Sequence, residues 1–442
     1  MKGDFTRDTF DPRNHYARVL WQQGRVQLDA DENERTAIFL HHMRSLARAL
    51  MGPHGGPDGA AGFAITRPAP AGDLFISRGC YFVDGILCEN EANVSYHEQP
   101  DLPIGQNEPL PTSPFLVYLD VWERHVTYVD DPRIREVALG GPDTAARARV
   151  VWQVKTVQVD PATTCANLPW QNLVDSWQPP NRGLLKARAR AASAVTDPCI
   201  TPPDAQYRGA ENQLYRLEIH DAEADGRRRP HTFKWSRENG SVVFPIVRLS
   251  ADTGAQTITV EVAHLGRDAR FGLAVGDWVE IVDDAYVLTN RAEPLHQVVA
   301  INRADSSVTL DGALGSAGTG RHPLLRRWDQ KGDGLIGGAV SLTEGSEDSG
   351  WLALEDGVQI QFQSGSPTQY RTGDYWLIPA RAATGDVEWP GGSANPEASR
   401  PHGVEHHYAP LAIVDPIRPP TDCRCGFSLV PEPCRPPKAA SP

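Results

Sequence analysis

The feature that most constrains the fold is a series of short strand patterns that begins near residue 74 and continues through most of the remaining chain. Apolar and polar residues alternate in 214–219 and 232–236, as in strands with one buried face. No strand–helix alternation accompanies them, which argues against a dinucleotide-binding fold. We therefore expect a mainly β protein with antiparallel, sandwich-like domains.

The 442 residues are long enough for several domains. Short strand patterns joined by polar turns at 275–282, 295–301 and 307–312 are typical of a small SH3-like barrel. The expected units are an N-terminal arm and helix (1–55), an antiparallel β domain (56–250), the SH3-like barrel (251–320), a further β domain (321–415) and a Pro- and Cys-rich extended tail (416–442).

A polar arm precedes the single long helix pattern. We expect the helix to begin at a capping box formed by Asp31 and Glu34 and to end at Gly52-Pro53. Its apolar residues are spaced four, three and four apart, which is a heptad seam of only about two repeats. Such a seam predicts weak dimerisation or trimerisation; the alternative is that it packs on the chain's own domain. The seam consists of Phe39, Met43, Leu46 and Leu50.

The arm itself carries large apolar residues but has no core of its own. A segment of this kind gains order only by burying those side chains elsewhere, so we expect it to dock on a neighbouring subunit. The expected assembly interface comprises the arm and the seam: Phe5, Phe10, Tyr16, Leu20, Trp21, Phe39, Met43, Leu46 and Leu50.

Charge and hydropathy disfavour some partners. With 43 Lys and Arg against 56 Asp and Glu, the net charge is -13, so a sequence-independent grip on nucleic acid is not expected. No apolar run reaches the roughly 18 to 20 residues of a membrane helix, and Lys2 and Asp4 follow Met1 where a signal peptide would be apolar. We expect cytoplasmic synthesis without a signal peptide and no membrane insertion.

The seven cysteines leave their pairing open. A two-residue turn at Asp84-Gly85 places Cys80 and Cys88 on opposite faces of a hairpin, so these two should not bond. Cys165 and Cys199 flank a Pro- and Gly-rich connection and could form a disulfide, or both could remain free thiols.

Two patterns are weak candidates for a metal site. His402, Glu405 and His406 match the H-x-x-E-H signature of inverted zinc proteases, which requires a helix, whereas Pro and Gly surround these residues. Three cysteines near the end of the chain could supply thiolates to zinc, with His406 or His407 as a fourth ligand, although their spacing is not that of a zinc ribbon. These cysteines are Cys423, Cys425 and Cys434.

Tryptophans that neighbour charged residues indicate a second class of function. Trp235, Arg237 and Trp376 have the chemistry of a sugar-stacking platform, which would suit a glycan- or cell-wall-binding module or hydrolase. The competing interpretation is that the rings fill a sandwich core. The sequence contains no nucleophile elbow and no phosphate-binding loop, which favours a structural or binding role over catalysis.

Strings spread over nearly the whole chain resemble an uncharacterised bacterial family associated with phage-tail-like contractile injection systems. They lie at 1–12, 22–31, 118–127, 135–144, 151–154, 207–209, 211–220, 233–239, 370–381 and 406–411. In addition, 24–34 is similar to the arm-to-helix start of some phage baseplate and tail-fibre proteins, where it opens a helix beside a threefold axis. Glu32 departs from this pattern, because the family usually has a bulky aromatic residue there.

The resemblance implies a non-enzymatic particle subunit such as a baseplate, cap or fibre adaptor. It implies contacts with further copies of the chain, as a homotrimer, and with other particle subunits, without a cofactor. The particle itself would be extracellular or cell-associated. A glycan-binding module and a metal-dependent hydrolase are the two alternatives.

Overall fold

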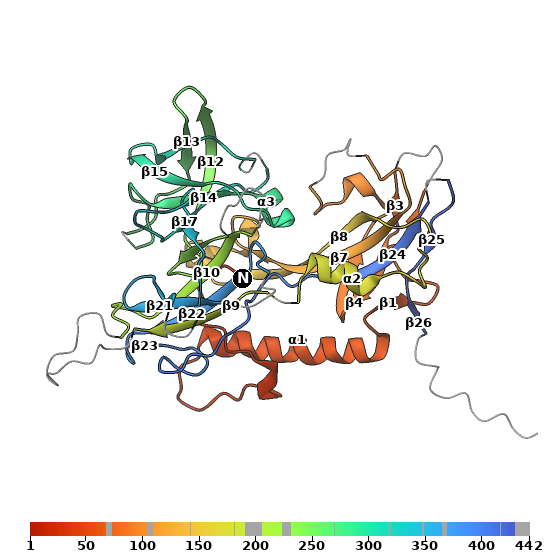
Figure 1. Cartoon of the computed structure of the whole chain (residues 1–442), viewed down its shortest axis with the longest axis horizontal. Helices are drawn as coiled ribbons and strands as arrows, with labels where there is room; N and C mark the ends of the chain where they lie inside the picture. The colour runs from red at the N-terminus through yellow and green to blue at the C-terminus, as the bar shows by residue number, and fades with distance from the viewer. Residues whose placement is uncertain are drawn as a thin grey trace, which may run out of the picture.

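Pairing between strands that are distant in sequence divides the chain into three bodies, each with its own apolar core. The expected mainly β class with antiparallel sheets is confirmed, and Figure 1 shows the three bodies with one long helix along an edge. The computed structural model describes residues 1–67, 73–103, 109–141, 143–180, 182–190, 206–222, 231–268, 270–316, 318, 320–346, 349–364, 369–415 and 417–428.

The first β body packs sheets β26-β1-β4-β5 and β25-β24-β7-β8, with the small sheet β2-β3-β6, around one core. In the predicted hairpin, Cys80 pairs with Glu89 and Tyr81 with Cys88, so the two thiols lie on opposite faces as expected. Its strands are β1 (His54–Pro57), β2 (Ile65–Thr66), β3 (Phe75–Ile76), β4 (Gly79–Val83), β5 (Ile86–Asn90), β6 (Val94–Ser95), β7 (Phe115–Val126), β8 (Arg147–Gln158), β24 (His407–Val414), β25 (Thr421–Asp422) and β26 (Gly426–Phe427).

The second β body faces sheet β18-β11-β10-β22-β23 with a sheet in which β21 pairs with β9, β19 and β20. The central strands β10 and β11 are buried on both faces, so the expectation of half-buried strands is wrong here. Its strands are β9 (Leu184–Ala189), β10 (Gln213–Asp221), β11 (Thr232–Ser236), β18 (Val340–Ser341), β19 (Glu344–Gly345), β20 (Leu352–Ala353), β21 (Val358–Gln363), β22 (Tyr375–Arg381) and β23 (Asp386–Val387).

The third body is a closed six-stranded barrel, in the order β12-β13-β16-β15-β14-β17. It extends beyond the predicted range 251–320 at both ends, because its first and last strands pair with each other. The strands are β12 (Val243–Asp252), β13 (Thr257–Val262), β14 (Trp278–Val282), β15 (Leu295–Asn302), β16 (Ser307–Asp311) and β17 (Leu324–Trp328), and the short helix α3 (Asp284–Thr289) follows β14.

The bodies are nested in the sequence. The barrel lies between β11 and β18 of the second body, and the second body lies between β8 and β24 of the first. The last described residues return to the first body, where β25 pairs with β24 and β26 with β1. The expected extended tail from residue 416 is therefore wrong for 421–427, and residues 429–442 lie outside the described part of the chain.

The long helix α1 (Asp29–Met51) begins two residues before the expected capping box. Leu28 is its N-cap residue and makes no side-chain capping bond, whereas the helix ends at Gly52 as expected. The remaining helices are α2 (Trp170–Trp177) and the single-turn segments η1 (Pro12–Asn14), η2 (Tyr96–Glu98), η3 (Pro132–Ile134) and η4 (Val137–Leu139). Among the described helices, none has both the length and the apolar character needed to cross a bilayer.

Helix α1 is fixed to the first β body along one side. Arg44 pairs with Glu123 at 2.8 Å, and Arg48 pairs with Asp84 at 3.3 Å. Gly85, in the turn between β4 and β5, has a φ of 80° and lies against the Arg44 backbone, where a Cβ atom would collide. These contacts determine which face of α1 points away from the protein.

Candidate functional site: an amino-terminal socket and an exposed helical stripe

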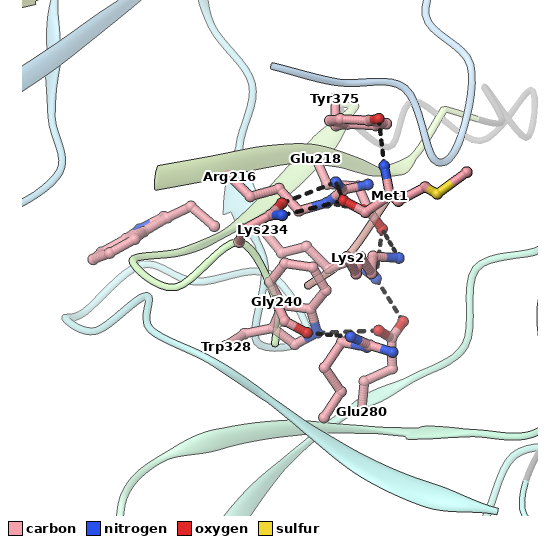
Figure 2. A network of polar contacts seen from close by, with 12 residues as sticks. Met1, Lys2, Arg216, Glu218, Lys234, Gly240, Glu280, Trp328 and Tyr375 are labelled. Atoms are coloured by element: carbon pink, nitrogen blue, oxygen red, sulfur yellow. Dashed lines mark hydrogen bonds and ion pairs between the residues drawn. The ribbon is translucent and has the colours of Figure 1, made fainter. Parts of the chain in front are cut away.

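The first three residues of the chain insert between the second β body and the barrel (Figure 2). The Met1 amino group donates to the Tyr375 hydroxyl at 2.7 Å. Asn239 Nδ2 donates to the carbonyls of Met1 and Gly3 at 3.2 and 2.9 Å, and Arg216 Nη1 donates to the Met1 carbonyl at 3.3 Å. Lys2 Nζ lies 3.0 Å from a carboxylate oxygen of Glu218. We call the four receiving residues, Arg216, Glu218, Asn239 and Tyr375, the amino-terminal socket.

Beneath the socket lies a buried ionic cluster that joins the two bodies (Figure 2). Lys234 on β11 pairs with Glu280 on β14 at 2.6 Å, and both side chains are almost fully buried. Glu280 also accepts bonds from Tyr286 Oη at 2.7 Å and Trp328 Nε1 at 3.0 Å. Buried charges are tolerated only when they are paired and hydrogen-bonded in this way. The cluster therefore holds the barrel in a defined position against β10 and β11.

The electrostatics of the site follow from burial and from these pairs. Burial alone would raise the pKa of Glu218, but the charges of Lys2, Arg216 and Lys234 outweigh it and hold that pKa below its usual value. Burial lowers the pKa of Lys2 to about 7 despite the attraction of Glu218, and lowers the pKa of the Met1 amino group to about 4. The Glu218 carboxylate thus offsets only part of the cost of burying the Lys2 ammonium.

The first residues of the arm dock on the chain's own body. The expectation that the arm is ordered only by a neighbouring subunit is therefore wrong for these residues. Phe5 is half-buried and packs edge-on to His125, with ring centroids 6.1 Å apart. Phe10 is also half-buried and lies 5.8 Å from the ring of His41 on α1. Both rings are therefore partly covered by contacts within their own chain.

The other seven residues of the predicted interface are exposed. On α1, the side chains of the seam point away from the body, so the alternative that the seam packs on its own domain is wrong. We call this row the helical stripe: Phe39 is 63% exposed, Met43 51%, Leu46 62% and Leu50 72%. In the arm, Tyr16 is 58% exposed, Leu20 68% and Trp21 40%.

Residues 1–51 hold more than half of the large apolar side chains that are exposed in the described part of the chain. Figure 1 shows α1 along one edge of the molecule with the arm looping beneath its N-terminal half. Isolated apolar residues on a surface are ordinary, but a continuous row of them on one helix face marks an interaction site.

The structure does not bring the predicted metal residues together. His402, Glu405 and His406 lie on an irregular segment that leads into β24, so the helix required by H-x-x-E-H is missing and this metal hypothesis is wrong. His406 instead bonds through Nδ1 to the buried Asp120 at 2.7 Å and stacks on Trp122.

The cysteines also pair differently from the expectation. Cys165 forms a disulfide with Cys423, which corrects the possible Cys165–Cys199 bond and removes Cys423 from the candidate zinc ligands. Cys425 is an exposed free thiol. Cys199 and Cys434 lie outside the described residues.

The predicted glycan platform is part of the core. Trp235 is 5% exposed and Trp376 1%, so neither has a ring face open to a sugar, and the predicted sugar contact is wrong for both. Arg237 is bound to Glu355 by two bonds of 2.8 and 2.7 Å. The rings fill the second β body, as the competing interpretation held.

Sequence reasoning missed the socket, since Arg216 and Glu218 occupy polar positions of an alternating strand and were expected to face water. The only signal was the unusual density of charge on β10 and β11.

Sequence reasoning also missed Asp130, Asp284 and His322, which lie close enough together to hold a cation. Arg124 already bridges the two carboxylates at 2.6 and 2.5 Å, which makes this group an ion-paired junction between the β7–β8 hairpin and the barrel.

Comparison with known proteins identifies a family but no activity. No curated protein and no solved structure matches the chain. One family model matches residues 1–178 and again residues 172–433, and it is described as a family of unknown function, DUF6519. Because these matches together cover almost the whole sequence, the chain belongs to the DUF6519 family.

Proposed function

We propose that the chain is a non-enzymatic structural subunit, a baseplate, cap or fibre adaptor, of a phage-tail-like contractile injection particle. In this proposal, copies associate as a homotrimer through α1 and the arm and contact other particle subunits. The particle context comes from the sequence resemblance described above, and the mode of association comes from the surface of the chain.

The observation that carries the proposal is the helical stripe. A spacing of four, three and four residues places all four side chains on one side of a helix, where each can insert between residues of a second helix. Water contact with such a row is unfavourable by roughly 25 cal/mol per Å² of apolar surface. A second copy of the same helix covers the row with a surface of identical spacing, which is why we infer self-association.

The exposed aromatic and aliphatic residues of the arm support the same inference. Tyr16, Leu20 and Trp21 lie outside every core of the described chain, yet they sit in the segment that directly precedes α1. Tyrosine and tryptophan are enriched at the centres of protein interfaces. We infer that these arm residues lie at the edge of the same interface, next to the contact between helical stripes.

The character of the buried polar groups supports a structural role. Glu218 and Glu280 are each held by several partners, as in an interface that fixes two bodies together. The cleft between the arm and α1 encloses about 90 Å³, whereas small-molecule sites usually measure about 300 to 1,000 Å³. Both features favour assembly over catalysis.

The test is incorporation into particles. A chromosomal C-terminal tag would follow the chain through purification of contractile particles from a producing bacterium. The stripe variant carries Phe39→Ser, Met43→Gln, Leu46→Gln and Leu50→Gln. The matched control replaces three exposed valines of the barrel: Val247→Ser, Val275→Ser and Val299→Ser.

We expect the wild-type chain and the valine control to purify with the particles and the stripe variant to remain outside them. The proposal of a particle subunit fails if the wild-type chain is absent from purified particles. The proposed role of α1 fails if the stripe variant is incorporated as well as the wild-type chain.

A further inference from the structure

We propose that the amino-terminal socket is a binding site for the Met1–Gly3 segment of a second copy of the chain, so that neighbouring copies exchange their arms. The proposal rests on the proposed function, because exchange requires that copies associate. The ligand class is a peptide amino terminus that carries a cationic side chain at its second position.

The contacts explain this ligand chemistry. Three of the socket's bonds reach main-chain carbonyls of Met1 and Gly3, and Asn239 makes two of them. Glu218 recognises the cation of Lys2. Gly3 is buried, and a Cβ atom at this position would meet the ring of Phe5. The site therefore reads main chain and charge, and glycine at the third position leaves room for the arm's own Phe5 ring.

The socket keeps its own partners when the arm leaves. Glu218 remains paired with Arg216 at 2.6 Å and lies 3.6 Å from Lys234. The Arg216 guanidinium also lies 3.5 Å from the ring centre of Tyr375. Since departure of Lys2 leaves no carboxylate without a cation, the vacant socket avoids the large cost of an unpaired buried charge. An occupant can therefore be exchanged without unfolding the site.

The segment that follows is built as a linker. In the described structure, the hydrogen bonds of residues 8–27 stay inside the arm, and its only helix is the single turn η1. Its ends meet where Thr6 donates two bonds to Asp29 at the start of α1. Twenty residues can span up to roughly 65 Å when extended, which is enough to reach an adjacent copy.

Exchange costs little because each contact of Met1–Gly3 is reproduced in the neighbour's socket. The difference between the two states lies in the linker. In the unexchanged chain, Tyr16, Leu20 and Trp21 are exposed, whereas a linker that crosses between two copies can cover them. The exposed linker thus favours the exchanged state once α1 has brought two copies together.

The test uses two full-length chains with C-terminal tags of different length. The donor carries the photocrosslinker p-benzoylphenylalanine in place of Phe5, whose ring lies beside His125 on β7 of the chain that holds the arm. The donor also carries Asn239→Gly, which removes the amide that binds Met1 and Gly3 but suits the φ of 50° at this position. The acceptor retains Asn239, and a matched control acceptor carries Asn239→Gly as well.

After co-expression and irradiation, we expect a donor–acceptor product crosslinked near the acceptor's His125, reduced at least several-fold with the control acceptor. If the native mass shows oligomers but all crosslinks stay within the donor chain, arm exchange is overturned. Self-association is then unaffected by this result. A monomeric native mass overturns exchange together with the proposed function. A donor that retains Asn239 provides a second measurement, and we again expect a crosslink between two chains. If the sample is oligomeric and this crosslink is absent, the result counts against exchange.

Discussion

Lys2 and Glu218 form an ion pair of 3.0 Å that joins the beginning of the chain to the centre of the second β body. The pair lies at the entrance of a cluster whose inner members, Lys234 and Glu280, connect that body to the barrel (Figure 2). The first residues of the arm are therefore connected through this cluster to the junction between the two bodies.

Lys2→Met should loosen the arm while leaving the three bodies folded. Glu218 keeps Arg216 as a partner, so at about pH 10, where Lys2 is a neutral amine in the folded chain and donates to the Glu218 carboxylate, we expect a cost of about 1–3 kcal/mol, the range for a lost bond to a charged group. Opening of residues 3–7 should become roughly tenfold or more frequent, since about 1.4 kcal/mol corresponds to a factor of ten, and pulsed hydrogen exchange at that pH measures it. Lys331→Met, at an exposed lysine, is the control and should leave exchange unchanged. Equal exchange in both variants would contradict the role assigned to Lys2.

Stability should also depend on pH through Lys2. Burial lowers the pKa of this lysine from 10.5 to about 7 in the folded chain. Between these values the unfolded chain binds more protons, so the free energy of unfolding that Lys2 contributes should rise with pH, by at most about 1.4 kcal/mol per pH unit. The measurement is the difference in unfolding free energy between wild type and Lys2→Met from pH 7 to 10. A difference that stays constant or falls over this range would show that Lys2 is not buried as a base with a lowered pKa.

The disulfide should stabilise the return of the chain to the first β body. Cys165 and Cys423 are separated by 258 positions, and cross-links of long loops can stabilise by up to about 5 kcal/mol. We expect the pair Cys165→Ser and Cys423→Ser to lower the thermal midpoint and to speed hydrogen exchange in 421–427. Cys425→Ser, at a free exposed thiol, is the control. If reducing agent leaves the wild-type midpoint unchanged, the bond does not form in solution.

Two tryptophans should behave oppositely. Trp376→Ala removes a ring that is 1% exposed in the core and should cost about 3–5 kcal/mol of stability. Trp21→Ala removes a ring that is 40% exposed in the arm and should leave stability nearly unchanged but weaken self-association. Chemical denaturation and sedimentation of both variants measure the two effects. A stable Trp376→Ala chain would reopen a surface role for that residue.

Local patterns predicted the elements that local physics determines. Alternation located β10 and β11, the Asp84-Gly85 turn fixed the register of Cys80 and Cys88, and a four-three-four spacing identified the row that the structure leaves exposed. Each of these inferences needs only the residues of one strand, turn or helix.

The errors have a different origin, because they concern contacts between distant residues. Burial of Arg216 and Glu218 depends on a barrel that begins after β11, and the Cys165–Cys423 bond depends on strands that return at the end of the chain. Helix α1 begins at Asp29, whose carboxylate binds the distant Thr6, two residues before the capping box that local spacing placed at Asp31.

Self-association through the helical stripe is the central claim, and the native mass of the purified full-length chain tests it most directly. Sedimentation equilibrium at micromolar concentrations should give about 145 kDa, the mass of three chains of 48.4 kDa, for the wild type and for the barrel valine control. The stripe variant should sediment at 48.4 kDa. A wild-type mass of 48.4 kDa throughout this range, or an unchanged oligomer in the stripe variant, would contradict the claim.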